Sequence, residues 1–170
     1  MRGTSNANSD EVKSTLERRI VYIERTYGSG RFSIEKLFTA IRSVVRCHWT
    51  CEVLTVPIPS DDKLWLIKAL ASIWFLDADL FHIVGDVHYA ALGLSKKKTI
   101  LTVHDLNHLD SLCGIRRLLY KILYFSIPLR RCAVITTISE ATKEKVLSLY
   151  PVLRNKVVVI PDCLPQGFVR

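Results

Sequence analysis

The sequence lacks a hydrophobic run long enough to cross a bilayer. Its longest largely apolar run covers Ala69–Leu76, whereas a spanning helix needs about 20 apolar residues. Residues 1–18 are polar and contain no apolar segment, so we expect no signal peptide there. We therefore expect residues 1–18 to be disordered or an appended leader. At about 150 residues per domain, residues 19–170 are expected to form one folded domain.

Cysteine is too scarce and irregular for a disulfide framework. The chain has five cysteines, an odd number, whereas small secreted scaffolds carry evenly paired cysteines in much shorter chains. This pattern favours reduced thiols and a cytoplasmic location. Cys47, His48 and Cys51 could offer metal ligands, but no second pair follows at a usable spacing. Because a tetrahedral zinc site needs four ligands, we expect no metal.

Acidic residues are outnumbered, with 16 Asp and Glu against 24 Lys and Arg, for a net charge of +8. This excess predicts affinity for anions such as phosphate-bearing ligands, acidic lipid surfaces or nucleic acid. No helix-turn-helix, zinc-finger or RNP-like pattern accompanies the charge, so we expect no nucleic-acid partner. Arg116, Arg117 and Lys121 lie among aromatic residues, which suits either an anionic membrane surface or a solvated helix face. The membrane interpretation would place a cytoplasmic protein peripherally on the inner face of the membrane.

Short β-branched runs alternate with segments of helical periodicity. The runs are apolar at successive positions, as expected for strands buried on both faces of a parallel sheet. The order is strand then helix, five times, followed by a sixth strand. This predicts an α/β fold: a doubly wound, mostly parallel, six-stranded Rossmann-like sheet with helices on both faces. The expected strands cover residues 19–23, 51–56, 80–84, 99–103, 133–138 and 156–160.

Helical periodicity also predicts which side chains face the sheet. The first helix is expected to bury Ile34, Leu37, Phe38, Ile41, Val44 and Val45. The second is expected to bury Leu64, Ile67, Leu70, Ala71 and Trp74. A third helix covers about 115–131, where Pro128 should end or kink it. A fourth begins at a capping sequence around Ser139.

In such sheets, ligands bind beyond the carboxyl ends of the strands. Gly28, Ser29 and Gly30 follow the first strand and could bind an anion or a sugar oxygen at a helix N-terminus, or simply form a flexible turn. Their spacing is one residue from the dinucleotide motif. That motif also needs an acidic residue at the end of the second strand, which residues 55–59 lack. A nicotinamide-dependent oxidoreductase is therefore disfavoured.

Polar residues follow three other predicted strands. His104 and Asp105 after the fourth strand are catalytic candidates, because an imidazole can bind a substrate hydroxyl while a neighbouring carboxylate orients it. The alternative is a capped loop with a solvated histidine. His82 lies within the third strand and is expected to belong to the core. The remaining substrate-binding candidates, each with a core or capping role as the alternative, are Asp86, His88, Ser139 and Glu140.

Four segments in chain order resemble the N-terminal domain of family-four retaining glycosyltransferases, which have two facing Rossmann-like domains (GT-B). These segments are residues 79–84, 99–106, 134–143 and 156–161. The resemblance implies transfer of a sugar, with retention, from a nucleotide-sugar donor to an acceptor glycan or lipid-linked sugar. It implies no metal or other cofactor. Carried over, it places Gly28 and Gly30 near the acceptor or the donor phosphate, His104 near the transferred sugar, and Asp105 beside it.

Two departures from the family pattern matter. Ile160 and Pro161 are followed by Asp162 and Cys163, where the family usually has Asn-Gly. The cationic pair and the E-x7-E glutamates that bind the donor in the family have no counterpart up to residue 170. We therefore expect an acceptor-side half that is inactive alone and needs a donor-binding domain or a separate chain. The alternative is a non-catalytic binding module for an anionic surface, a carbohydrate or a partner protein.

Overall fold

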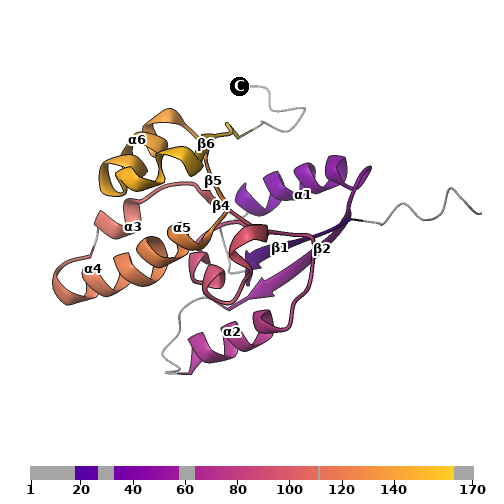
Figure 1. Ribbon diagram of the computed structural model, residues 1–170, viewed down its shortest axis with the longest axis horizontal. Helices are drawn as coiled ribbons and strands as arrows, with labels where there is room; N and C mark the ends of the chain where they lie inside the picture. The colour runs from indigo at the N-terminus through magenta and orange to yellow at the C-terminus, as the bar shows by residue number, and fades with distance from the viewer. Residues whose placement is uncertain (1–17, 27–32, 58–63, 111, 163–170) are drawn as a thin grey trace, which may run out of the picture.

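The computed structural model describes residues 18–26, 33–57, 64–110 and 112–162. Its centre is a six-stranded sheet with the order β2-β1-β3-β4-β5-β6, in which every neighbouring pair is parallel (Figure 1). The predicted α/β fold and all six predicted strands are therefore confirmed, with small shifts at their ends. The strands are β1 Arg19–Arg25, β2 Thr50–Val56, β3 Leu80–Ile83, β4 Thr99–Val103, β5 Val134–Thr137 and β6 Val157–Val159.

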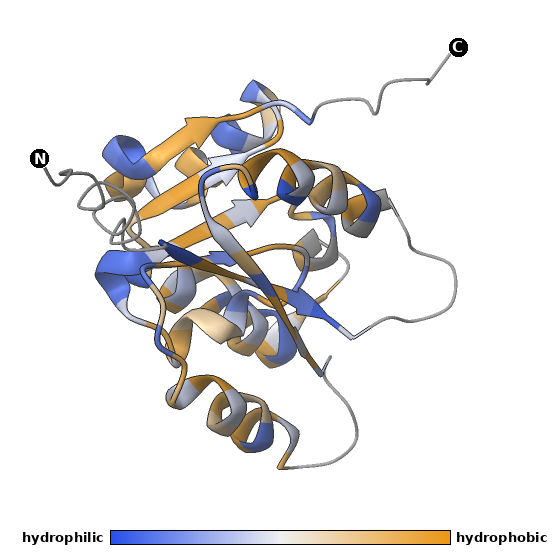
Figure 2. Ribbon diagram, turned by 90° about the vertical axis from the view of Figure 1, so that its right-hand side faces the viewer, coloured by the Kyte–Doolittle hydropathy of each residue, from blue (hydrophilic) through white to orange (hydrophobic). Residues whose placement is uncertain are grey.

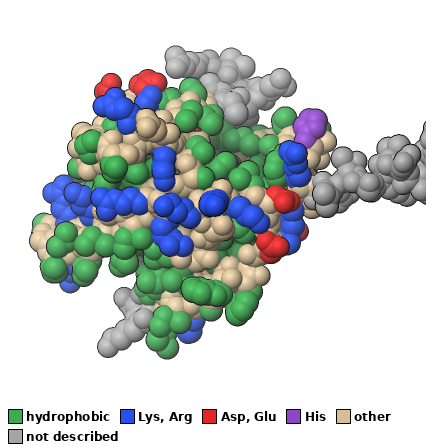
Figure 3. Space-filling model, in the orientation of Figure 1, with side chains coloured by type: hydrophobic (Ala, Val, Ile, Leu, Met, Phe, Trp, Pro, Cys, Tyr) green, Lys and Arg blue, Asp and Glu red, His purple; other side chains and the backbone are tan. Residues whose placement is uncertain are grey.

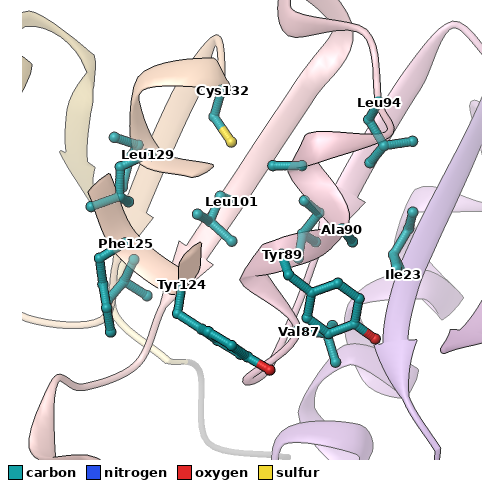
Figure 4. Packing of buried hydrophobic residues seen from close by; sticks show 14 of the residues in the cluster. Ile23, Val87, Tyr89, Ala90, Leu94, Leu101, Tyr124, Phe125, Leu129 and Cys132 are labelled. Atoms are coloured by element: carbon teal, nitrogen blue, oxygen red, sulfur yellow. The ribbon is translucent and has the colours of Figure 1, made fainter. Parts of the chain in front are cut away.

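Helices cover both faces of the sheet, which separates two hydrophobic clusters. Helix α1 (Ser33–Val45) lies on one face, where Leu37 and Phe38 pack against Tyr22. The other helical segments with buried residues contribute to the larger cluster on the opposite face, part of which Figure 4 shows. The apolar strands stand out in Figure 2, whereas the helices carry both polar and apolar residues. These segments are α2 Trp65–Trp74, η2 His88–Leu92, α3 Asn107–Asp110, η4 Lys121–Ser126, α5 Ile127–Arg131, α6 Glu140–Leu149 and η5 Pro151–Lys156.

The connection between β3 and β4 differs from the prediction of a helix after every strand. It contains only the short 3₁₀ helices η2 and η3 (Lys96–Lys98). Ala90 and Ala91 are fully buried here, and a Cβ atom on Gly93 would lie 3.2 Å from the Ile73 side chain. Small residues thus let this segment pack directly against α2 and the sheet. Two short 3₁₀ helices therefore take the place of the predicted helix.

The predicted inner face of α2 is wrong. Ile67 and Trp74 are 65% and 68% exposed, whereas Ala69 and Ile73 are buried against the sheet. The helix is apolar on nearly all sides, so periodicity alone could not choose its inner face; the small Ala69 side chain allows the closest approach. On α1, Val44 likewise faces outward, at 70% exposure.

Pro128 does not end its helix, but a π-helical turn precedes it. Helix α4 (Gly114–Tyr120) continues through the π-helical segment η4 into α5, and Pro128 lies in the first turn of α5. Proline cannot donate to the carbonyl four residues earlier, which here is that of Tyr124. The wider π-turn accommodates the ring, and His88 Nδ1 donates to Tyr124 O instead, at 2.9 Å. Within the described ranges, no helix has the length and apolarity needed to cross a membrane.

Candidate functional site at the carboxyl edge of the sheet

The carboxyl ends of the parallel strands meet at one edge, which we call the carboxyl edge. In Figure 1, β1 and β2 point toward the side of the molecule where α3 (Asn107–Asp110) and α4 lie. The polar groups that follow the strands therefore gather there, as they do in ligand-binding α/β sheets. They are Arg25 at the end of β1, Asp86 and His88 after β3, His104 and Asp105 after β4, Ser139 and Glu140 after β5, and Asp162 after β6.

His104 lies at the centre of this edge. Its Nε2 atom is buried and has no hydrogen-bond partner, while its ring meets the Phe38 ring edge-on at 6.2 Å. The Thr142 hydroxyl donates to His104 O at 3.4 Å and so ties the loop to α6. Burial lowers the pKa of His104, although Asp162, Asp86 and Asp105 oppose the shift. The ring is therefore held as a neutral imidazole, with a nitrogen ready to bind a ligand hydroxyl.

Carboxylates surround His104, and each approaches from a different strand. Gly85, with φ of +74°, turns the chain after β3 and brings Asp86 to 3.8 Å from Arg25 Nη1. Asp105 is exposed, and its Oδ1 accepts from the backbone N–H of Asn107 at 2.9 Å, which begins α3. The charges of Asp86, Asp105 and Asp162 are all near enough to act on His104. The described part of the edge is thus locally acidic within a basic protein.

His82 belongs to the core, as its position within a strand suggests. Its Nε2 atom lies 2.8 Å from Thr102 Oγ1, which in turn lies 2.7 Å from Thr136 Oγ1. The ring packs at 5.3 Å against Phe38. Burial lowers the pKa of His82 to about 4. A chain of polar side chains therefore crosses β3, β4 and β5 beneath His104.

Three other candidates have structural partners in the fold. His88 is buried, and its Nδ1 donates to the carbonyl oxygen of Tyr124. Ser139 directly precedes α6, and its Oγ accepts from the N–H of Thr142 at 3.1 Å. This contact caps the helix, which is the alternative role predicted for Ser139. Glu140 lies 3.4 Å from Lys143 on the same helix. None of these contacts tests a role in ligand binding.

The glycine-rich candidates Gly28, Ser29 and Gly30 lie outside the described residues. Among the described residues, no group of three or more His, Cys, Asp or Glu side chains could hold a metal ion. The described cysteines Cys47, Cys51, Cys113 and Cys132 are free thiols.

The membrane-surface candidates lie on a helix that packs against little else. None of the residues of α4 is buried. Arg116 and Arg117 are exposed, as are Ile115, Leu118 and Leu119. Lys121 is half-buried, with its ammonium group 5.7 Å from the centre of the Tyr150 ring. Figure 3 shows Lys and Arg side chains in a band that begins at the α4 end of the molecule, beside hydrophobic side chains.

Sequence reasoning missed several groups at this edge. The predicted first strand ends at residue 23, so strand-end position does not indicate Arg25, which ends β1. Asp162 was noticed only as a departure from a family pattern. The ion pair between Glu24 and Arg42 is buried and joins β1 to α1; no local spacing indicates it, because the partners lie 18 residues apart.

Comparison with known protein families gives a match that covers most of the chain. The family model for Glycosyltransferase Family 4 matches residues 26–164, which include every described strand-end group except Arg25. No curated protein matches the chain.

Proposed function

The chain belongs to glycosyltransferase family 4, and we propose that it forms the acceptor side of a retaining glycosyltransferase. In this proposal the carboxyl edge binds an acceptor glycan or a lipid-linked sugar. The donor is a nucleotide-sugar, bound mainly by a second domain that faces this edge, in the same polypeptide or in a separate chain. Neither a metal ion nor another cofactor is required.

The observation that carries the proposal is the buried, unpartnered Nε2 of His104. A buried polar atom without a partner costs free energy, so an unpartnered ring nitrogen at the carboxyl edge supports ligand binding there. The neutral ring can bind a sugar hydroxyl without adding a charge, because burial lowers the pKa of His104. Asp105, exposed beside it, is the nearest carboxylate in sequence that could bind a further hydroxyl.

The charge at the carboxyl edge supports binding of the acceptor by this domain and of the donor's diphosphate by a second domain. A departing nucleoside diphosphate must be stabilised by cationic groups. At the described part of the edge, the charges acting on His104 are three carboxylates and Arg25, and Arg25 is already 3.8 Å from Asp86. This environment suits an acceptor hydroxyl better than a diphosphate. The cations for the leaving group would therefore come from the facing domain.

The proposed reaction is a front-face substitution. The bond between the sugar's anomeric carbon and the diphosphate oxygen breaks, giving an oxocarbenium-like state, and a bond to the acceptor oxygen forms on the same face. The acceptor hydroxyl's proton passes to the departing diphosphate oxygen. His104 and Asp105 would hold the sugar and the acceptor hydroxyl in place during this step.

Acceptor binding and sugar transfer can be measured separately on the purified chain. We expect saturation-transfer NMR to detect binding of uncharged glycans, and no sugar transfer from labelled nucleotide-sugars by the chain alone. His104→Ala should weaken glycan binding about fivefold, the loss of one hydrogen bond. His48→Ala, which removes an exposed histidine far from the edge, is the control and should bind normally. Enzyme-like transfer by the chain would refute its dependence on a second domain; no glycan binding would refute the acceptor role.

A second candidate function is docking on an anionic membrane. Ile115, Leu118 and Leu119 share one face of α4 and are all more than half exposed, with Arg116 and Arg117 beside them. An apolar stripe flanked by arginines suits the boundary between acyl chains and acidic headgroups. Such docking would hold a cytoplasmic protein at the inner membrane face and bring lipid-linked acceptors to the carboxyl edge.

Vesicle flotation tests this docking. The chain should float with vesicles containing about one-third phosphatidylserine and not with pure phosphatidylcholine vesicles. Replacing Arg116 and Arg117 by Glu should abolish flotation. The same charge change at Lys96 and Lys97, which are exposed on η3, should leave most of it. Equal recovery with both vesicle types, or equal loss from both double variants, would rule out a specific α4 surface.

A further inference from the structure

Helix α2 has a second apolar face that the described fold leaves uncovered. Ile67 and Trp74 are more than half exposed, and Phe75, directly after the helix, is 90% exposed. Ala71 lies between Ile67 and Trp74 and is exposed as well. Their spacing of four and three residues puts Ile67, Ala71 and Trp74 on one side of the helix. Because another side of α2 packs on the sheet, the fold uses only one of its two apolar faces. We call Ile67, Ala71, Trp74 and Phe75 the α2 surface.

The size of the α2 surface is that of an interface rather than of scattered exposed residues. A helix that is apolar on all sides is normally buried on all sides, and contiguous exposed apolar residues mark interaction sites. An aromatic side chain buries about 150–250 Å² when it is fully covered. With two aromatic side chains, the α2 surface supplies a large share of the roughly 800 Å² that each partner buries in a standard interface.

The lack of charge on the α2 surface argues against a membrane as its occupant. Lys68 is the one charged residue of α2, whereas helices that lie on membranes carry several Lys or Arg beside their apolar stripe. In Figure 1, α2 lies at the lower border of the molecule, and Figure 3 shows hydrophobic side chains there, below the band of Lys and Arg. An uncharged apolar surface is best covered by another one.

The position of the α2 surface argues against the second domain as its occupant. The segment after α2 is tied to the start of β1: Arg19 Nη1 donates to Asp77 O at 3.0 Å, and the N–H of Asp79 donates to Arg19 O at 3.0 Å. Trp74 and Phe75 therefore lie near the amino end of the sheet. The second domain of the proposed function faces the opposite end, the carboxyl edge.

We propose that the α2 surface binds a second copy of this chain, with the two α2 helices packed antiparallel around a two-fold axis near Ala71. A two-fold interface uses the same surface on both copies. Since Ala71 lies close to the midpoint between Ile67 and Trp74, Ile67 of one copy lies opposite Trp74 of the other. The small Ala71 side chain lets the helices approach closely where they cross. Both carboxyl edges stay free in this dimer, so the inference goes beyond the proposed function and does not depend on it.

Sedimentation velocity of the purified chain from about 1 to 100 µM, the range in which modest interfaces associate, tests the dimer. We expect the fraction of dimer to rise with concentration. Ala71→Glu and Ala71→Lys each bring two like charges together at the axis and should weaken dimerisation about tenfold or more. An equimolar mixture of these two variants should form dimers again, because position 71 then meets the opposite charge.

Val44→Glu is the matched control. It places the same charge on an apolar residue of α1 that is 70% exposed, so it should dimerise like the original chain. Because Ala71 and Val44 are both exposed, all three variants should keep the melting temperature of the original chain, measured by circular dichroism.

The other outcomes would overturn the proposal. A chain that stays monomeric over the whole range does not pair through α2. A dimer that Ala71→Glu leaves intact forms through another surface, and a mixture of the two variants that stays monomeric means that the copies do not meet at Ala71. Flotation of the original chain with pure phosphatidylcholine vesicles, lost in Ala71→Glu, would make a membrane the occupant. Glycan binding at His104 is measured separately, so each proposal can fail without the other.

Discussion

The two ends of the sheet differ in their polar groups. Cations at the amino end are hydrogen-bonded, whereas several buried polar atoms at the carboxyl end have no partner. At the amino end, cations that begin strands, or directly precede them, donate to nearby carbonyl oxygens. Lys98 Nζ donates to Ala78 O at 2.8 Å, Lys156 Nζ to Cys132 O at 3.0 Å, and Arg19 Nη1 to Asp77 O at 3.0 Å. These contacts hold the starts of β4, β6 and β1 to the segments beside them.

The carboxyl end keeps polar atoms unpaired. Among the described residues, four buried side-chain atoms lack a hydrogen-bond partner. Three of them, Glu24 Oε2, His104 Nε2 and Thr137 Oγ1, lie at or next to the carboxyl ends of β1, β4 and β5. Buried polar atoms without partners destabilise a fold, so their concentration at the carboxyl end supports the ligand binding that we propose there.

The largest effect on this comparison should come from the buried ion pair at the carboxyl end. Arg42 pairs with Glu24, and both side chains are buried. Arg42→Met leaves the carboxylate buried without its cation, which should lower the free energy of unfolding by about 3–5 kcal/mol. Urea unfolding followed by circular dichroism measures it.

Two controls make that result specific. Glu52→Gln breaks the exposed pair between Arg19 and Glu52 at the amino end and should change stability little, because exposed pairs contribute little. The double variant Glu24→Leu with Arg42→Met removes both charges and should recover much of the loss. A loss for Arg42→Met as small as that for Glu52→Gln would mean that the buried pair at the carboxyl end contributes no more to stability than the exposed pair at the amino end.

Acid should weaken the polar chain beneath the carboxyl edge. Burial holds the pKa of His82 at about 4 in the folded protein, below its ordinary value of 6.5. The unfolded chain therefore binds a proton at higher pH, so the contribution of neutral His82 is complete above pH 6.5 and is lost as the pH falls toward 4. The loss is about 3 kcal/mol at the acid end of that window.

Unfolding free energies measured between pH 7 and 4 test this expectation. Burial also lowers the pKa values of His88 and His104, so the original chain should show their contributions too. His82→Gln should reduce the slope and leave these other contributions in place. An unchanged slope would mean that His82 does not titrate as its burial requires.

Two threonines of neighbouring strands allow a direct test of paired against unpaired groups. Thr102 lies within hydrogen-bond distance of both His82 and Thr136, whereas Thr137 Oγ1 has no partner. Thr102→Val should therefore cost about 1–3 kcal/mol, because it leaves a buried partner unsatisfied. Thr137→Val removes an orphaned hydroxyl and should be neutral or stabilising. Thermal unfolding of both variants decides, and equal losses would mean that Thr137 has a partner in solution.

Sequence reasoning predicted the strands well because buried parallel strands are apolar at several successive positions. It failed where two faces of one helix were equally apolar, as with Ile67 and Ile73 on α2. At the site, strand-end position found His104 and Asp86, since topology alone brings such residues to one edge. It could not predict the hydrogen bond from His88 to Tyr124 O, because the two residues lie in different segments, 36 residues apart.

The smallest effect concerns Ser139, which lies at the carboxyl end but has a partner. Its Oγ accepts from the N–H of Thr142, and Thr142 in turn contacts the carbonyl of His104. Ser139→Ala should cost about 1 kcal/mol through loss of the helix cap, whereas Ser139→Asp keeps an acceptor there and should retain most of the stability. Glycan binding should weaken only in step with stability, because Ser139 acts through the fold. If Ser139→Asp restored stability and glycan binding stayed lost, Ser139 would belong to the ligand site with His104, and the boundary between structural and binding groups at this end would have to move.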